Sequence, residues 1–169
     1  GDGSDGVAQN ITTQINNYAR VTAINDTRNI LTYSKKTTAG AAPFKVGALV
    51  MVHPMHKDSE NVKYSGRFHV SKIIGLTSTK ITLQDPIPKL NTLDINYYNW
   101  QVVTIPQYSS FTLNKENAAT PKYASGRGGI LAFACSGTCD ISNGLLNVEG
   151  KGGGVAYGKE GLKYISNGG

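Results

Sequence analysis

A period of two dominates the glycine-rich stretch from residue 126 to residue 154. Apolar side chains occupy alternate positions there, and smaller or polar side chains lie between them. Such alternation is typical of β-strands that bury one face and expose the other. We therefore expect one row of side chains to point into a core. That row is Leu131, Phe133, Cys135, Cys139 and Ile141, and it resumes at Leu146 and Val148.

Glycines at positions 137, 144 and 150 interrupt this pattern at nearly constant spacing. Short strands separated by glycine corners are typical of a β-helix or solenoid, in which each turn buries its face on the next. The alternative is a meander of hairpins, because Asn143 and Gly144 form a standard two-residue hairpin turn. We favour the solenoid, and the meander stays open.

Residues 18–105 show a different pattern, in which five or six short β-rich runs are separated by turn signals. The run 48–53 is apolar on both faces, and Pro54 is expected to end it. No long window keeps a helical period, so almost no helix is expected. This spacing fits a small antiparallel barrel. The expected strands are 20–24, 29–33, 48–53, 68–74, 80–83 and 97–105.

The chain is therefore expected to be all-β and to divide into three parts. Residues 1–17 form a polar leading segment or linker, residues 18–105 a barrel-like domain, and residues 106–169 the start of a glycine-rich β-helical region within a longer chain. Composition supports the last division, since 13 of the 20 glycines lie from residue 126 onward. Asp2, Ser4 and Asp5 offer oxygens to calcium, but no glutamate completes an EF-hand loop, so a turn is preferred.

The net charge of +6 comes from 17 basic and 11 acidic residues that are spread along the chain. Nucleic-acid binding usually requires a concentrated basic stripe, so no nucleic-acid partner is expected. Weak attraction to polyanions such as acidic glycans is compatible with this charge. No apolar run approaches the roughly 18 residues of a membrane-spanning helix, so no membrane span is expected.

The only two cysteines are Cys135 and Cys139. Four steps along an extended strand span about 13 Å, whereas a disulfide needs Cα atoms less than about 7 Å apart. A bridge would require a tight turn at residues 136–138. We instead expect free thiols that face the core, because their parity matches that of Phe133 and Ile141.

Three histidines form a weak candidate for a metal site: His53, His56 and His69. The His-x-x-His spacing falls on a strand end and a loop, whereas a zinc protease places His-Glu-x-x-His on a helix. Surface histidines are the simpler interpretation. We expect no metal and no cofactor.

Tyrosines are the best candidates for ligand contact. A tyrosine joins a rigid apolar ring to a hydroxyl that can hydrogen-bond, which suits sugar and protein surfaces. The alternative is that several of them fill the barrel or its junction with the glycine-rich part. The candidates are Tyr97, Tyr98, Tyr108, Tyr123, Tyr157 and Tyr164.

Carboxylates suitable for glycoside hydrolysis occur at Asp140, Glu149 and Glu160. Solvated acids of this kind are much commoner than catalytic pairs. We therefore do not expect an enzyme.

Three stretches resemble the glycine-rich tail-fibre and surface-adhesin proteins of phages and bacteria. They are GDGSDG at 1–6, FKVGALV at 44–50 leading to WQVVTIP at 100–106, and GGILAF at 128–133 with SGT at 136–138 and VEGKG at 148–152. The resemblance implies attachment to a cell-surface receptor, often as a homotrimer, at a virion tail or cell surface. It carries over no binding residue, because the matching positions are turns and core. The cysteines depart from the small or β-branched residues usual there.

The sequence thus predicts a non-enzymatic structural or receptor-binding part of a phage tail fibre or similar attachment appendage. Its expected partner is a cell-surface glycan or protein, and a trimer would raise avidity and cover exposed strand edges. Two alternatives stay open: the entry domain of a polysaccharide-degrading β-helix enzyme, and a bacterial cell-surface adhesin. Release of reducing ends that is lost in Asp140→Asn or Glu149→Gln would favour the enzyme.

Overall fold

The computed structural model describes residues 1–9, 11, 14–34, 36–38, 40–55, 67–89, 99–113, 116–119, 128–147, 156–157 and 163–164. Every regular element in these ranges is a β-strand, which confirms the all-β prediction. No helix long and apolar enough to cross a membrane occurs in this part of the chain.

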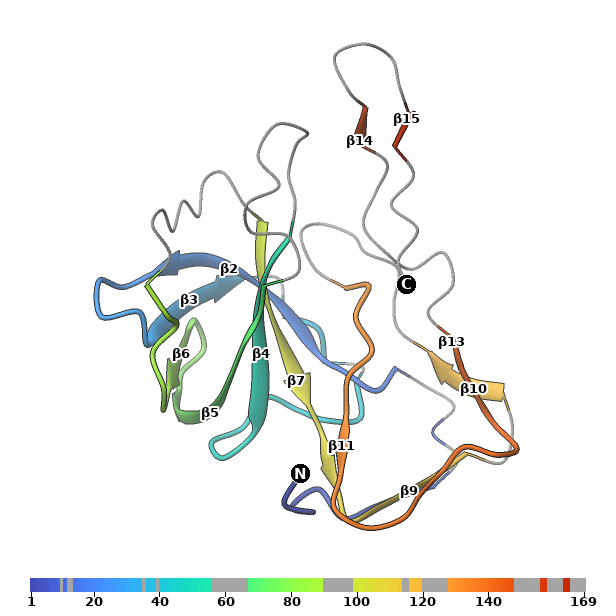
Figure 1. Ribbon diagram of the computed structural model, residues 1–169. Coiled ribbons are helices and arrows are strands. Elements are labelled where there is room, and N and C mark those ends of the chain that lie inside the picture. Colours follow the sequence, from blue (N-terminus) through green and yellow to red (C-terminus); the bar gives the residue numbers. More distant parts are fainter. Residues whose placement is uncertain are drawn as a thin grey trace.

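Six antiparallel strands close into a barrel, in the order β2–β3–β6–β5–β4–β7 (Figure 1). This confirms the prediction of a small barrel in the first two thirds of the chain. Alternate side chains fill its interior, and Val50, Ile73 and Ile81 are fully buried there. The strands are β2 (Tyr18–Ile24), β3 (Ile30–Ser34), β4 (Leu49–Met55), β5 (His69–Leu76), β6 (Lys80–Leu83) and β7 (Asn99–Ile105).

Pro54 lies inside β4, so the expectation that it ends this strand is wrong. Pairing of β4 with β5 stops at Val52 opposite His69, but pairing with β7 continues to Met55 opposite Asn99. Proline has no N–H to donate and is therefore tolerated where one edge of a strand has no partner. The strand continues past the proline because only β7 accompanies it.

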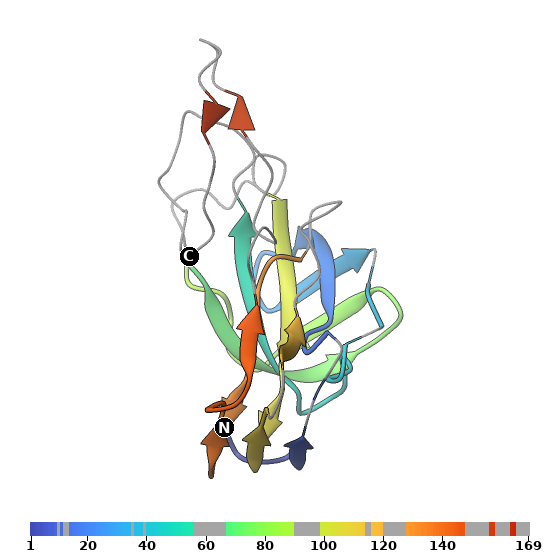
Figure 2. The same cartoon turned by 90° about the vertical axis from the view of Figure 1, so that its right-hand side faces the viewer.

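Outside the barrel, seven of the described strands form three parallel sheets, which we call the parallel layers. The first is a sheet in which β9 lies between β1 and β12; in the others β8 pairs with β11, and β10 pairs with β13. Figure 2 shows β1, β9 and β12 side by side at the base of the view. The strands are β1 (Val7–Gln9), β8 (Gln107–Tyr108), β9 (Ser110–Thr112), β10 (Glu116–Ala119), β11 (Ala134–Cys135), β12 (Cys139–Asp140) and β13 (Leu145–Asn147).

Along the sequence, the barrel lies between β1 of the first layer and β8 of the second. The chain leaves β1 at Gln9, forms the six barrel strands and returns from Ile105 to β8 at Gln107. The leading segment then pairs with the returning chain: the Asp5 N–H donates to the Gln107 carbonyl at 2.8 Å, and Val7 lies opposite Ser110. Part of residues 1–17 is therefore a strand of the layers.

A second hydrophobic core lies within the parallel layers. Phe111 is fully buried at its centre, with its ring centroid 4.3 Å from that of Phe133 and 5.6 Å from that of Tyr108. The other buried members are Ala8, Ile15 and Leu113, and the partly buried members are Ile11, Leu131, Phe133, Cys135 and Leu146.

This second core corrects the predicted row of inward side chains. Leu131, Phe133, Cys135 and Leu146 pack against it as expected. Cys139 and Ile141 do not: Cys139 is exposed, and Ile141 is 42% exposed. The chain bends at Ser136 and Gly137, and strict alternation does not carry across a corner between two sheets. Val148 lies outside the described residues.

The two cysteines are free thiols, as expected. The Cys135 thiol donates to the Thr138 carbonyl at 3.2 Å and contacts the second core. The prediction that both thiols face the core is correct for Cys135 and wrong for Cys139.

At two of the glycine corners, the backbone passes close to Ser109 and Leu113. A Cβ atom on Gly144 would lie 2.3 Å from the Leu113 Cβ, and one on Gly137 would lie 2.6 Å from the Ser109 carbonyl oxygen. The strands beside Asn143 and Gly144 pair with β9 and β10 and not with each other, so this turn does not close a hairpin. Two of the predicted corners therefore have a steric reason to be glycine.

Barrel side chains bind the extended stretch that precedes β11. The fully buried Gln101 accepts a hydrogen bond from the Gly128 N–H at 2.8 Å and donates to the Gly128 carbonyl at 3.2 Å. The buried Asn16 acts in the same way on Ala132, accepting from its N–H at 3.1 Å and donating to its carbonyl. The Tyr18 hydroxyl donates to the Ile130 carbonyl. These side chains replace the strand partner that the stretch would otherwise need.

Replacing Gln101 by leucine is expected to lower the free energy of unfolding by about 2 kcal/mol. The leucine has a similar volume but leaves the buried N–H and carbonyl of Gly128 without partners, and each loss costs about 1–3 kcal/mol. Urea unfolding followed by circular dichroism measures the change. Gln84→Leu, at an exposed position, is the control, and an equal effect in both variants would contradict the prediction.

Candidate functional site

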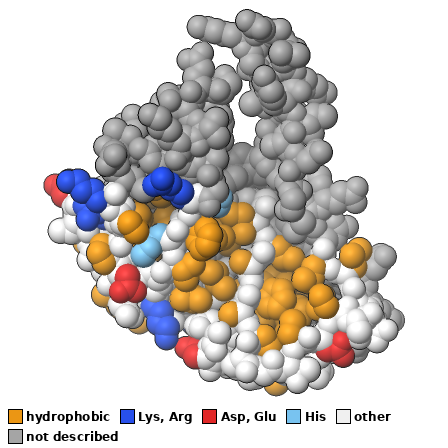
Figure 3. All heavy atoms as spheres, viewed as in Figure 1, with side chains coloured by type: hydrophobic (Ala, Val, Ile, Leu, Met, Phe, Trp, Pro, Cys, Tyr) orange, Lys and Arg blue, Asp and Glu red, His pale blue; other side chains and the backbone are white. Residues whose placement is uncertain are grey.

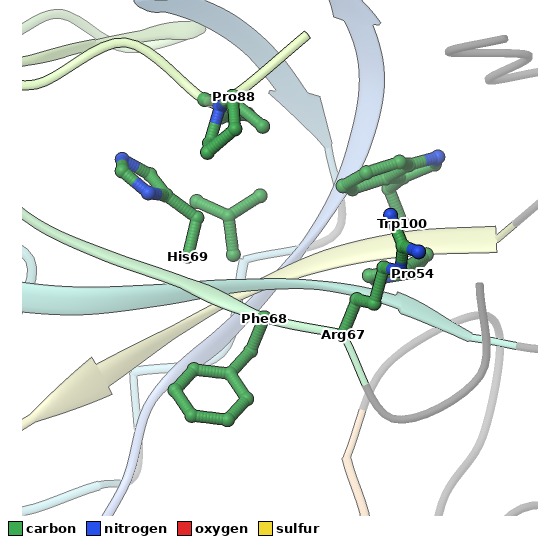
Figure 4. Close-up of a pocket in the computed structure, with 8 residues that line it drawn as sticks. Pro54, Arg67, Phe68, His69, Pro88 and Trp100 are labelled. Atoms are coloured by element: carbon green, nitrogen blue, oxygen red, sulfur yellow. The ribbon is translucent and has the colours of Figure 1, made fainter. Parts of the chain in front are cut away.

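A cavity of about 330 Å³ opens where β4 ends and β5 and β7 begin (Figure 4). Most of its lining is apolar. The close-up places His69 and Trp100 on opposite sides of the cavity, whereas the Phe68 ring points away from it. The lining residues are Val52, Pro54, Arg67, Phe68, His69, Ile87, Pro88 and Trp100.

The barrel pattern explains why these residues meet. Val52 and His69 are opposite each other in the register of β4 and β5, so their side chains share the inner face. Pro54 and Trp100 are opposite each other in the register of β4 and β7. Backbone and side-chain bonds between Arg28 and Ile87 hold the segment after β6 across the opening, with Arg28 Nε 2.8 Å from the Ile87 carbonyl oxygen.

Three polar groups lie at this cavity. His69 Nε2 is 2.9 Å from the Asp85 carbonyl oxygen, and the Asp85 N–H in turn donates to the hydroxyl of the buried Ser71. The buried Trp100 indole N–H has no hydrogen-bond partner among the described residues, and in Figure 4 it points away from the cavity. The Arg67 side chain is exposed at the rim. The lining thus combines an apolar body with the polar side chains of His69 and Arg67.

The structure places one of the candidate tyrosines in the second core. Tyr108 is 5% exposed and lies against Phe111 and Phe133, and burial, with the charge of Asp5, raises the pKa of its hydroxyl to about 12. This fits the alternative that some tyrosines fill the junction between barrel and glycine-rich part. Tyr157 and Tyr164 lie on β14 (Ala156–Tyr157) and β15 (Lys163–Tyr164), an antiparallel pair.

The remaining candidate tyrosines, Tyr97, Tyr98 and Tyr123, lie outside the described residues. Their role in ligand contact stays a prediction.

The structure does not bring His53 and His69 together. His69 shares the inner face of the barrel with Val52, whereas the next residue, His53, faces the other side of the sheet. Burial lowers the pKa of His53, and within the described part of the chain its Nδ1 has no hydrogen-bond partner. Within the described ranges no three His, Cys, Asp or Glu side chains are grouped closely enough to hold a metal ion, and His56 lies outside them.

Asp140 has a local structural role. Its carboxylate accepts hydrogen bonds from the Ser142 hydroxyl at 2.6 Å and the Ser142 N–H at 3.0 Å, and these bonds lower its pKa. Asp140 therefore shapes the turn before Gly144. Glu149 and Glu160 lie outside the described residues.

The acidic side chains of the leading segment bind lysines of the barrel. Asp5 forms an ion pair of 2.7 Å with Lys45, and Asp2 one of 3.2 Å with Lys72. The Asp2 carboxylate also accepts the Ser4 N–H at 3.0 Å. These contacts support the interpretation of the opening residues as a turn that is fixed to the barrel.

The pKa of Asp2 is expected to rise in Ser4→Ala. Hydrogen bonds from the side chain and backbone of Ser4, and then the contact with Lys72, hold this pKa well below its usual value. Because the folded-state pKa is lowered, the stabilisation is present above the unfolded-state value of about 3.9 and is lost as the pH falls below it. Carboxyl carbon shifts measured against pH check this. Lys72→Gln should raise the pKa less than Ser4→Ala, and a larger rise would contradict the ranking.

Comparisons of the chain with protein-family models, with curated proteins and with solved structures gave no match. The functional argument therefore rests on the residues themselves. The cavity was missed from the sequence, because its lining residues come from four separate stretches and none of them forms a motif.

Proposed function

We propose that this chain is a structural and receptor-binding segment of an elongated attachment appendage, such as a phage tail fibre, and that it is not an enzyme. The observation that carries the proposal is the parallel stacking of segments far apart in sequence: Val7 lies opposite Ser110, and Phe111 lies opposite Cys139. Parallel layers of this kind are the building principle of β-helical shafts.

The layers can be extended at both sides. Among the described strands, β1 and β12 each have a partner on one side only. An unpaired parallel edge accepts a further layer of the same chain or a strand of another chain. In this proposal the barrel is a unit attached to the side of a β-helical shaft that continues from residue 106.

Exposed apolar side chains support an assembly of several copies. Phe68, which precedes β5, is 65% exposed. On β5, Val70 and Ile74 are 38% and 54% exposed and alternate with the buried Ser71 and Ile73. Figure 3 shows apolar side chains gathered over the front of the barrel and beside β11. Apolar areas of this kind are typical of surfaces that a second chain covers. We propose a homotrimer at a virion tail or cell surface.

Binding of the whole chain to an array of bacterial surface polysaccharides and outer-surface proteins tests the attachment function. We expect saturable binding to at least one surface component, without release of reducing ends from it. Binding by a trimer should exceed that of a single chain because of avidity. Release of reducing ends would contradict the non-enzymatic assignment, and the Asp140→Asn variant would then show whether that carboxylate is involved.

Light scattering tests the assembly. The expected solution mass is three times the 18.0 kDa of one chain. A mass of 18.0 kDa would show that these residues do not hold a trimer together by themselves.

A further inference from the structure

We propose that the barrel cavity binds a compact uncharged apolar group, such as a single aromatic or alicyclic ring. The cavity is formed within one chain, and the inference goes beyond the attachment function and does not depend on it. Failure of the array experiment would therefore leave it unaffected, and failure of the titrations below would leave the attachment function unaffected.

The walls of the cavity are rigid. Pairing of β4 with β5 stops at Val52, whereas β4 and β7 continue together, so the barrel wall is incomplete beside Val52. Two hydrogen bonds hold the segment after β6 across this opening: the Ile87 N–H donates to the Arg28 carbonyl at 2.9 Å, and Arg28 Nε donates to the Ile87 carbonyl at 2.8 Å. Pro54 and Pro88 add side chains that have almost no rotamer freedom to lose. The cavity is therefore formed before a ligand arrives, which lowers the cost of binding.

The unfilled volume suits one ring. Val52, Ile87 and Trp100 are at most 2% exposed, yet they border a cavity of about 330 Å³. This volume is near the lower end of the range of about 300–1,000 Å³ that is typical of small-molecule sites, and an apolar cavity of about 150 Å³ is enough for benzene. Side chains around an unfilled space lack contact partners on that side, and an apolar ligand supplies them.

The polar atoms of the lining do not face the ligand. In Figure 4 the carbon edge of the Trp100 indole is directed toward the cavity, and both ring nitrogens of His69 lie on the side of that ring away from Trp100. His69 Nε2 is 2.9 Å from the Asp85 carbonyl oxygen, which can only accept, so the Nε2–H is already used. Arg67 is not free either. A charged group or a sugar hydroxyl would therefore lose its water here without gaining a partner, so the lining favours a hydrocarbon.

Three ligands of the same shape and different polarity test this preference: toluene, phenol and the N-methylpyridinium ion. Each is titrated into the whole chain at equal ionic strength, and the carbon-bound ring protons of Trp100, the only tryptophan, are followed by NMR. We expect saturable shifts with toluene, with a dissociation constant of about 1 mM or tighter, and nuclear Overhauser effects from toluene to Trp100 and Val52. Phenol should bind about tenfold more weakly, because its hydroxyl loses hydrogen bonds to water, and N-methylpyridinium should give no saturable shift.

Val52→Phe and Val46→Phe add the same ring at different places. Val52 borders the cavity, whereas Val46 lies before β4 and is 61% exposed. We expect Val52→Phe to fill the cavity and to weaken toluene binding by about tenfold or more without lowering the urea midpoint, because filling a cavity commonly stabilises a protein. Val46→Phe should leave the affinity within about twofold, since the two sites are separate. The titrations of the unmodified chain decide the matter even if Val52→Phe does not fold.

The proposal is overturned if the Trp100 signals do not saturate with toluene up to about 5 mM, several times the expected dissociation constant. It is also overturned if phenol or N-methylpyridinium binds as tightly as toluene, or if Val46→Phe weakens binding as much as Val52→Phe. Toluene binding that weakens as the protein concentration rises would show that a second copy of the chain fills the cavity, and this result would overturn the proposal as well.

Discussion

Phe111→Ala is expected to lower the opening free energy of the parallel layers by about 3–5 kcal/mol, the usual cost of removing a fully buried phenylalanine. Phe111 is fully buried, and its ring stacks on Phe133 at 4.3 Å and lies 5.6 Å from Tyr108. Alanine would leave a cavity between the rings of Tyr108 and Phe133. The second core would then lose the contact that joins β8, β9 and the segment before β11.

Amide hydrogen exchange measures this loss where it occurs. The N–H groups of Leu113 and Ser136 donate to the carbonyls of Asp140 and Tyr108 between neighbouring strands of a layer, so their exchange should accelerate. Val7→Ala is the matched control, because Val7 is on the same sheet but 63% exposed. Unchanged protection of Leu113 and Ser136 in Phe111→Ala would show that the rings do not hold the layers together.

Gly144→Ala is expected to destabilise the protein by about 3 kcal/mol, the upper part of the range for overpacking. The new Cβ would lie 2.3 Å from the Leu113 Cβ and 2.7 Å from its carbonyl oxygen, so backbone must move. The sign of the effect is diagnostic. Where a glycine serves only as a flexible turn residue, replacing it by alanine usually stabilises the protein by about 0.4–1 kcal/mol, because alanine lowers the conformational entropy of the unfolded chain.

Urea unfolding followed by circular dichroism measures the effect at this corner. Asn143→Ala, at the preceding exposed position of the same turn, is the control and should change stability by less than about 0.5 kcal/mol. A stabilised Gly144→Ala variant would mean that this corner does not pack closely against Leu113.

The barrel was predictable because its information is local. Alternating apolar runs, a hairpin at residues 25–28 and glycine or proline between runs all favour short antiparallel strands. The bounds of all six expected strands lie within two residues of those in the structure. The predicted end of β4 was wrong because a proline in the sequence does not indicate which edge of a strand is paired. That information comes from β7, some 45 residues later.

The layers were harder to predict, because parallel pairing leaves no local mark. The alternation from Leu131 to Cys135 gives the correct inner face, but the bend at Gly137 resets it, so Cys139 points outward. Val7 and Ser110 pair across the whole barrel, and nothing near either residue indicates the other.

The cavity was missed for a related reason. Trp100 and Val52 are ordinary strand residues in the sequence, and they border a cavity only because β4 and β7 extend beyond the start of β5. The buried side-chain amides of Asn16 and Gln101 were also missed, because polar residues in or before a strand are expected on its solvent-exposed face.

The insertion of the barrel has a consequence for the order of folding. Val7 must find Ser110 across about a hundred residues, a contact whose loop entropy would make it slow to form in an open chain. The first and last barrel strands are neighbours, however, with Tyr18 opposite Val103. Closing the barrel therefore brings β1 and β9 close together and lowers the loop entropy that their pairing costs. The barrel acts as a tether that sets the register of the layers, and we expect it to form before them.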